Sequence, residues 1–249
     1  MRFFTFLAQT ATHTTKHYAG YFSALIAAVI TLLLGTALAT LIALVSRAIF
    51  AYFNISLAQF FLLQGAYAVV GMLLMFVVVT FLGGVVVLSA LTTDGTTKNL
   101  KALIPHFTSF LFLTILLVIG SMIAKAPIHG MASLMLTRND NALFSILLLI
   151  MSAVMHIGLI LFASIAPFLM LDTGQHLKPT IVKTYAMIKK NIAFLIKRIL
   201  GAFIILFLIH FGIISTRSEE LVTVWILCMV LFFAPFMVSY FALTYKELK

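Results

Sequence analysis

Side chains that could carry acid–base or metal chemistry are few in this chain and lie far apart. The six acids all fall outside the long apolar segments: Asp94, Asp140, Asp172, Glu219, Glu220 and Glu247. Hydrolysis by paired carboxylates needs two such groups at one place, and ion-coupled carriers usually keep an ionisable group near the middle of the membrane. The sequence therefore argues against a carboxylate-driven carrier and against hydrolysis within the bilayer.

Two histidines, His156 and His210, do lie inside long apolar segments. A neutral imidazole there needs a hydrogen-bond partner, and two of them could relay protons or hold a metal ion. Because neither has a partner at H-E-x-x-H or Cys/His spacing, we favour a hydrogen bond to a polar side chain of another helix, worth about 1 kcal/mol. The other histidines are expected to meet water; they are His13, His17, His106, His129 and His176.

Five cations form the strongest charge feature of the sequence: Lys183, Lys189, Lys190, Lys197 and Arg198. We favour a role in fixing topology, because lysine and arginine accumulate on the cytoplasmic side of membrane segments. The alternative is a docking site for anionic lipid headgroups. In either case Lys197 and Arg198, just inside an apolar segment, are expected to extend their side chains to the headgroups.

The segment 63–91 combines Gln64 with several small residues, namely Gly65, Gly71, Gly83 and Gly84. Small residues let helices approach one another closely, and this is the interpretation we favour. The alternative is a broken helix that lines a path for a substrate, with Gly83 and Gly84 as its weak point.

Sequence motifs of enzymes are absent. The chain has no GxxxxGK[ST] phosphate loop, no GxSxG elbow and no GxGxxG after a predicted strand. Its single cysteine, Cys228, lies in an apolar segment and is expected to be a packed or lipid-facing side chain. We therefore predict no enzyme, no cofactor and no metal site.

The elements that must position these residues are membrane-spanning helices. Of 249 residues, 63% are hydrophobic and 9% are charged, and the mean hydropathy is +1.21. An ordinary soluble domain is about one-quarter charged, so this chain has too few charges for a water-exposed surface. Topology and anionic headgroups then account for the net charge of +10, and nucleic acid is not expected as a partner.

Six apolar segments reach or nearly reach the length of about 20 residues that crosses a bilayer. They cover 22–44, 63–91, 107–124, 142–171, 192–214 and 221–244, of which the third is the shortest. The apolar stretch 49–61 is interrupted by Asn54, Ser56 and Gln59, so we predict an interfacial helix there. The predicted fold is all-α, a single membrane domain of six helices over residues 1–249.

The distribution of positive charge predicts an orientation. Twelve of the sixteen lysines and arginines fall on one side of this layout, together with both termini. The positive-inside rule then places the N- and C-termini in the cytoplasm. Since no compact apolar region with a cleavage site precedes the first long segment, we do not expect a cleaved signal peptide.

The ends of the second, fourth and sixth segments resemble one another. They read VTFLGGVVVLSALTTDG at 79–95, FASIAPFLMLDTG at 162–174 and LFFAPFMVSYFALTYKEL at 231–248. The last two share an APF triplet, whose proline should kink the helix. This pattern predicts an internal repeat.

Short segments of mixed polarity precede the first, third and fifth apolar segments. The clearest is KPTIVKTYAMIKKN at 178–191, where Ile181, Tyr185 and Ile188 share one helical face while Lys183 and Lys190 face away. Such segments should lie in the membrane interface. The predicted layout is therefore three hairpins, each made of a surface helix, a span and a returning span.

The stretch APFLMLDTGQHLKPTIVKTYAMIKKN at 166–191, with the ending LTYKEL, resembles bacterial inner-membrane proteins of the YciC-like kind. It is also similar to the membrane domain fused to some glycerophosphodiester phosphodiesterases. Asp172 and Thr173 stand where longer acidic turns are common in such chains. The resemblance implies a six-helix inner-membrane protein with a poorly defined biochemical role, and it supplies no catalytic residue.

Three functions follow as hypotheses. The first is a non-enzymatic inner-membrane protein, a structural, assembly or envelope-homeostasis factor in contact with lipid and with a partner membrane protein or a second copy. The second is a permease or channel subunit for a lipid or small solute, in which cysteines placed at Gln64, His156 and His210 would react with an aqueous thiol reagent. The third is a bacterial effector inserted in a membrane.

Overall fold

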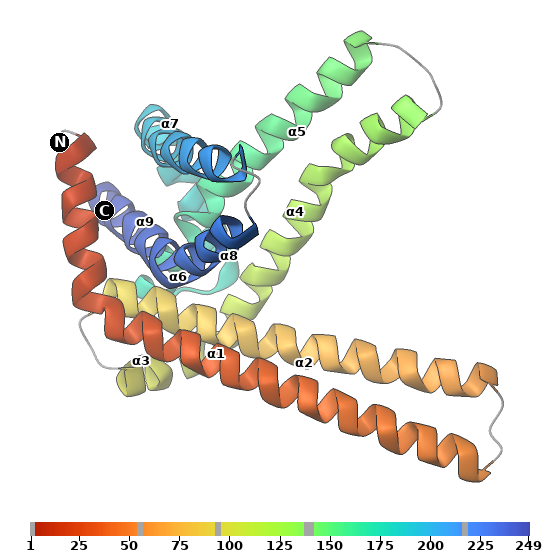
Figure 1. Ribbon diagram of the computed structural model, residues 1–249. Coiled ribbons are helices and arrows are strands. Elements are labelled where there is room, and N and C mark those ends of the chain that lie inside the picture. Colours follow the sequence, from red (N-terminus) through yellow and green to blue (C-terminus); the bar gives the residue numbers. More distant parts are fainter. Residues whose placement is uncertain (1–2, 54–56, 93–95, 137–141, 216–218) are drawn as a thin grey trace.

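The computed structural model of the chain is almost entirely helical in the part that it describes, with no strand in that part (Figure 1). It describes residues 3–53, 57–92, 96–136, 142–215 and 219–249, and within these ranges most but not all side chains. The predicted all-α fold class is therefore confirmed.

The helices differ greatly in length. In chain order they are α1 (Phe3–Phe53), α2 (Leu57–Leu91), α3 (Thr96–Leu103), the 3-10 turn η1 (Ile104–His106), α4 (Phe107–Leu136), α5 (Ala142–Ala163), α6 (Ala166–Thr173), α7 (Leu177–Ser215), α8 (Glu219–Cys228), the π-helical turn η2 (Met229–Phe233) and α9 (Ala234–Leu248).

Within the described residues, five helical stretches are long and apolar enough to cross a membrane. They are Phe4–Val45, Ala68–Leu91, Lys98–Gly130, Leu143–Thr173 and Glu220–Leu248. By length and composition these are the helices of a multi-pass membrane protein. The predicted span 192–214 lies within the long helix α7, and several of its side chains fall outside the described residues.

The expected surface helices are mostly parts of longer helices. Helix α1 runs without interruption through the N-terminal segment and on to Phe53, and α2 begins at Leu57, so the described part of 49–61 belongs to these two helices. Residues 57–61 thus lead into the second predicted span, while residues 49–53 end the first helix, and the interfacial position of 49–61 stays a prediction. Helix α3 runs through η1 into α4, within the helical stretch Lys98–Gly130, and the segment 178–191 forms the first part of α7, before a kink at Asn191 (φ −120°, ψ 23°).

Two long helix pairs diverge from one packed region. Helix α1 lies along α2, and α4 lies along α5, but the two pairs point in different directions away from that region (Figure 1). Both ends of the chain lie in the packed region, where the Phe6 ring meets the Tyr240 ring edge-on at 5.0 Å. We call this region the packed end, and the far halves of the two pairs the outer ends.

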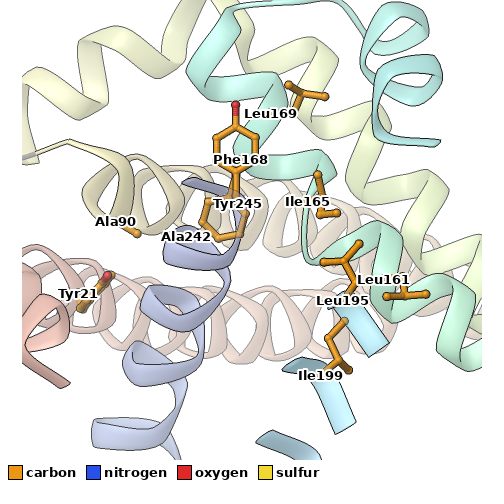
Figure 2. Close-up of a cluster of buried hydrophobic side chains, with 10 residues drawn as sticks. All are labelled: Tyr21, Ala90, Leu161, Ile165, Phe168, Leu169, Leu195, Ile199, Ala242 and Tyr245. Atoms are coloured by element: carbon orange, nitrogen blue, oxygen red, sulfur yellow. The ribbon is translucent and has the colours of Figure 1, made fainter. Parts of the chain in front are cut away.

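The core of the packed end is built from the repeated segments. One cluster of buried side chains contains Ala90 of α2, Phe168 of α6 and Tyr245 of α9, one from each repeat, together with residues of α1, α5 and α7 (Figure 2). The Phe168 and Tyr245 rings stack at 6.3 Å. Parts of all three similar segments therefore meet in this cluster, while the internal repeat itself stays a prediction.

The two APF triplets interrupt their helices in different ways. Before Pro167 the chain leaves the helix at Ile165 (φ −121°, ψ −46°), and α6 starts afresh. Before Pro235 the helix instead widens into the π-helical turn η2. Proline has no N–H for the carbonyl four residues earlier, which after Pro235 is that of Leu231. The hydroxyl of Tyr18 donates to that Leu231 oxygen at 3.2 Å and so supplies a donor from another helix.

Gly174 ends α6 in a left-handed conformation (φ 62°). A side chain there would be strained, and a Cβ atom would also lie 3.0 Å from the His106 ring. Glycine thus lets the chain turn sharply from α6 toward α7 beside η1.

Candidate functional site

Arg198 is part of the core of the packed end. Its side chain is 7% exposed, and its guanidinium donates to the Glu247 carboxylate of α9 at 2.8 Å. The same guanidinium lies 3.5 Å above the centre of the Phe6 ring of α1. The expectation that Arg198 extends to the headgroups is therefore wrong, because a carboxylate and an aromatic face are available inside the protein.

The four lysines of the predicted basic cluster, in contrast, are exposed on α7. Lys183, Lys189, Lys190 and Lys197 all lie on its outer surface. The opposite, buried stripe of α7 follows the helical period through Thr180, Thr184, Leu195, Arg198 and Ile199. The kink at Asn191 lets this stripe follow the core, and the Asn191 amide donates to the Met187 carbonyl at 3.1 Å.

Apolar side chains accompany these lysines on the exposed surface. Tyr185 and Val182 are both more than 60% exposed, and Ile192 is about half exposed. Of the face expected to lie in the interface, Ile181 and Ile188 are instead half-buried against the protein. The exposed surface of α7 therefore mixes cations with apolar groups, as helices at a membrane interface do.

A second ionic contact joins α6 to the C-terminal end of α9. The Asp172 carboxylate accepts from the Tyr245 hydroxyl at 2.7 Å and from the Lys249 ammonium at 2.9 Å. Asp172 and Glu247 were expected in a loop and in the tail, but both lie near helix ends and pair with cations there. Asp94 and Asp140 lie outside the described residues.

His156 contacts its own helix. Its Nδ1 atom lies 2.8 Å from the Ser152 carbonyl and 3.2 Å from the Ser152 hydroxyl oxygen, one turn earlier in α5. The Ser152 hydroxyl donates to the Ala124 carbonyl of α4 at 2.9 Å. The hydrogen bond between helices that was expected of His156 is thus made by Ser152.

Two other candidates, Gln64 and His210, lie in α2 and α7, but their side chains fall outside the described residues. Helix α2 continues through Gly83 and Gly84, which excludes a break at that point. Gly84 allows close packing, because a Cβ atom there would lie 2.8 Å from the Leu103 side chain of α3. Gly83 has open space around it.

Two histidines for which only water was expected are half-buried in the packed end. The His13 and His17 rings stack at 4.3 Å on α1, and the His13 Nδ1 atom is buried without a hydrogen-bond partner in the described structure. Lys16 and Lys246 lie close enough to act on both rings electrostatically. The spacing of four residues could have suggested this pairing, but Lys246 comes from the other end of the chain.

A cavity of about 250 Å³ lies between α1, α2 and the η2–α9 segment. Its walls are almost entirely apolar and include Leu25, Leu82, Gly83, Pro235 and Val238. No periodicity in the sequence predicts this cavity, since it depends on how three distant segments meet.

Among the side chains that the structure describes, no three His, Cys, Asp or Glu residues lie close enough to share a metal ion. Comparison of the chain with models of known protein families, with curated proteins and with solved structures finds no match. The interpretation of the site therefore depends on its geometry and on the sequence.

Proposed function

We propose that this chain is a non-enzymatic, multi-pass protein of a bacterial inner membrane, a structural, assembly or envelope-homeostasis factor that binds anionic lipid. The observation that carries the proposal is the division of charge at the packed end. Arg198 and Asp172 pair with Glu247 and Lys249, while the lysines of α7 are exposed beside apolar side chains. Paired charges join helices, and exposed lysines next to apolar groups suit anionic headgroups.

The proposed location and orientation rest on the sequence. The excess of lysine and arginine on one predicted side favours cytoplasmic termini, and the YciC-like resemblance of 166–191 favours a bacterial inner membrane. The packing of Phe6 against Tyr240 supports placing both ends of the chain on the same side. Fusion of green fluorescent protein to each end should give fluorescent cells, and a periplasmic alkaline phosphatase fusion should be inactive there.

Lipid dependence of stability tests the functional part of the proposal. The purified protein in mild detergent is titrated with dioleoyl phosphatidylglycerol or dioleoyl phosphatidylcholine, and its thermal unfolding midpoint is measured. Each lysine near an anionic surface contributes about 1 kcal/mol. We therefore expect the variant K183Q/K189Q/K190Q/K197Q to lose most of the stabilisation that phosphatidylglycerol gives.

A matched control separates this surface from charge in general. K189Q/K190Q changes two exposed lysines of α7, and K101Q/K125Q changes two exposed lysines of α3 and α4. The α7 pair should lower the effect of phosphatidylglycerol more than the control pair. Equal effects of the two pairs, or equal stabilisation by both lipids in the wild type, would contradict the proposal.

A further inference from the structure

Small residues on three helices leave room for the cavity between α1, α2 and α9. Small residues face it from three sides, at Ala28 of α1, Gly83 of α2 and Ala234 of α9. The wide turn η2 and Pro235 form its fourth part. The rim residues Phe22, Val79 and Val230 are each about half exposed, so the cavity opens to the surroundings of the helices.

The cavity suits an apolar occupant. Its two hydroxyls already have partners, since Tyr18 donates to the Leu231 carbonyl and Tyr21 bonds to the Ser239 hydroxyl at 2.8 Å. A polar ligand would therefore leave its own groups without hydrogen bonds. An apolar cavity that offers water no hydrogen-bond partners favours apolar molecules. In a bilayer, the molecule at hand is the acyl chain of a lipid.

Positive charge lies on α1 and α9 just beyond the cavity. From Tyr21 in its wall, His17, Lys16 and His13 follow toward the N-terminus, and eight helical residues span about 12 Å. The Lys246 ammonium of α9 donates to the Leu91 carbonyl at 3.3 Å, which leaves two of its three protons for other acceptors.

Among the acids whose side chains the structure describes, Asp172 is the one that acts on Lys246. Asp172 is already bonded to Lys249 and to Tyr245. Among the described residues, Lys16 and Lys246, which both act electrostatically on the half-buried histidine pair, therefore give this place an excess of positive charge. An anion is the complementary partner.

We infer that the cavity holds one acyl chain of an anionic phospholipid whose phosphate lies against Lys16 and Lys246. The inference rests on the proposed function, because it names a specific site for the same class of ligand. It adds that one lipid is bound at a defined place between α1, α2 and α9, apart from the general attraction of headgroups to α7. The lipid would then complete the packing of the C-terminal helix against the first hairpin.

Filling the cavity tests the acyl-chain part. A side chain at Gly83 meets no atom within 4 Å, and the same is true of Gly71 on the outer part of α2. Gly83→Leu should fill the cavity, while Gly71→Leu makes the same chemical change outside it. Native mass spectrometry of the detergent-purified protein with added dioleoyl phosphatidylglycerol should show about tenfold weaker binding of the tightest lipid in Gly83→Leu, since two or more methylene groups lose their place.

Gly71→Leu should bind this lipid as the wild type does. Ala28→Leu, from the opposite wall, gives a second variant should Gly83→Leu not fold. Unchanged binding in the cavity variants, or equal loss in Gly71→Leu, would overturn the inference.

The headgroup part is tested by charge. Lys16→Gln/Lys246→Gln should remove the preference of the tightest site for phosphatidylglycerol over dioleoyl phosphatidylcholine. Glycerol 3-phosphate, which has no acyl chain, should not displace the lipid. Displacement by glycerol 3-phosphate, or a lipid preference that survives the double variant, would mean that the site is not the one inferred.

The two proposals fail separately. The four α7 lysines do not line the cavity, so K183Q/K189Q/K190Q/K197Q should keep the single tight lipid even though it loses the general anionic-lipid effect. Loss of the tight lipid in that variant would overturn the separate site. An absent anionic-lipid effect with an intact tight site would instead overturn only the proposed α7 surface.

Discussion

The packed end and the outer ends contain similar apolar residues, but these residues are buried at the packed end and exposed at the outer ends. At the packed end Leu103, Leu113 and Leu195 are fully buried, and polar side chains pair between helices. At the outer ends Leu33, Met72 and Leu143 are each more than 60% exposed. The difference shows that some apolar side chains pack against protein while others face the surroundings of the helices. Only the packed side chains must match the shape of their neighbours closely.

Polar and small residues lie where helices pack against one another. The packed end holds the buried Arg198, the hydroxyl of Tyr240 that donates to the Arg198 carbonyl at 2.7 Å, and Gly84 beneath Leu103. The outer end of the α4–α5 pair shows a single interhelical bond of this kind in its described part, between Ser152 and Ala124. Specific association of helices within a membrane depends on such groups.

Substitution of a buried leucine at the packed end should have the largest effect on stability. Leu195→Ala at the packed end should lower the free energy of unfolding by about 2–5 kcal/mol, because it leaves a cavity in the core. Leu147→Ala, at an exposed position of the outer end, should change it by less than about 0.5 kcal/mol. Unfolding in mixed micelles, followed by circular dichroism, measures both. Equal losses would show that the outer ends are packed as tightly as the core.

The next effect concerns the buried ion pair. Glu247→Ala should lower the free energy of unfolding by about 2 kcal/mol, because it leaves Arg198 buried without its carboxylate. The loss is smaller than for a fully buried pair because the Glu247 side chain is 30% exposed. Lys249→Ala removes the exposed partner of Asp172 and should cost under about 1 kcal/mol. The same unfolding assay compares the two, and the double variant Arg198→Leu/Glu247→Leu should recover part of the loss. A larger cost for Lys249→Ala would reverse our ranking of the two ionic contacts.

The loss of one hydrogen bond between α4 and α5 should have the smallest effect on stability. Ser152→Ala removes the hydrogen bond to Ala124 and should cost about 0.6–1 kcal/mol, the usual value for such bonds within a membrane. Ser145→Ala, one residue from the exposed Phe144 and Ile146, is the control within α5 and should have a smaller effect. A double-mutant cycle with His156→Ala would show whether the imidazole contributes through Ser152. A zero coupling would mean that it does not.

Part of this architecture could be predicted from the sequence. The apolar segments 22–44, 63–91, 107–124, 142–171 and 221–244 lie in helices that are apolar and long enough to cross a membrane, because a backbone in lipid must satisfy its hydrogen bonds within each segment. The interruptions of the helices at the two APF triplets could also be predicted, since each depends on a proline at that point of the chain.

The site depended on contacts between distant residues. Whether Arg198 reaches the headgroups or pairs with Glu247 is decided 49 residues away along the chain, where α9 passes. Likewise the His13 and His17 pair became half-buried only because the ends of α2 and α9 lie against α1. The amino-acid composition determines neither the partner of Arg198 nor the burial of the two histidines, since both depend on which helices come together.

The amino-acid sequence is enough to locate the long apolar helices of this chain, because length and hydropathy act locally and lipid allows few alternative backbone structures. Contacts between distant helices determine which apolar surfaces form the core, which charges are paired and where a cavity opens beside Gly83. The physical reason is that lipid and protein interior are nearly equivalent for an apolar side chain, so close packing and hydrogen bonding between helices make the choice.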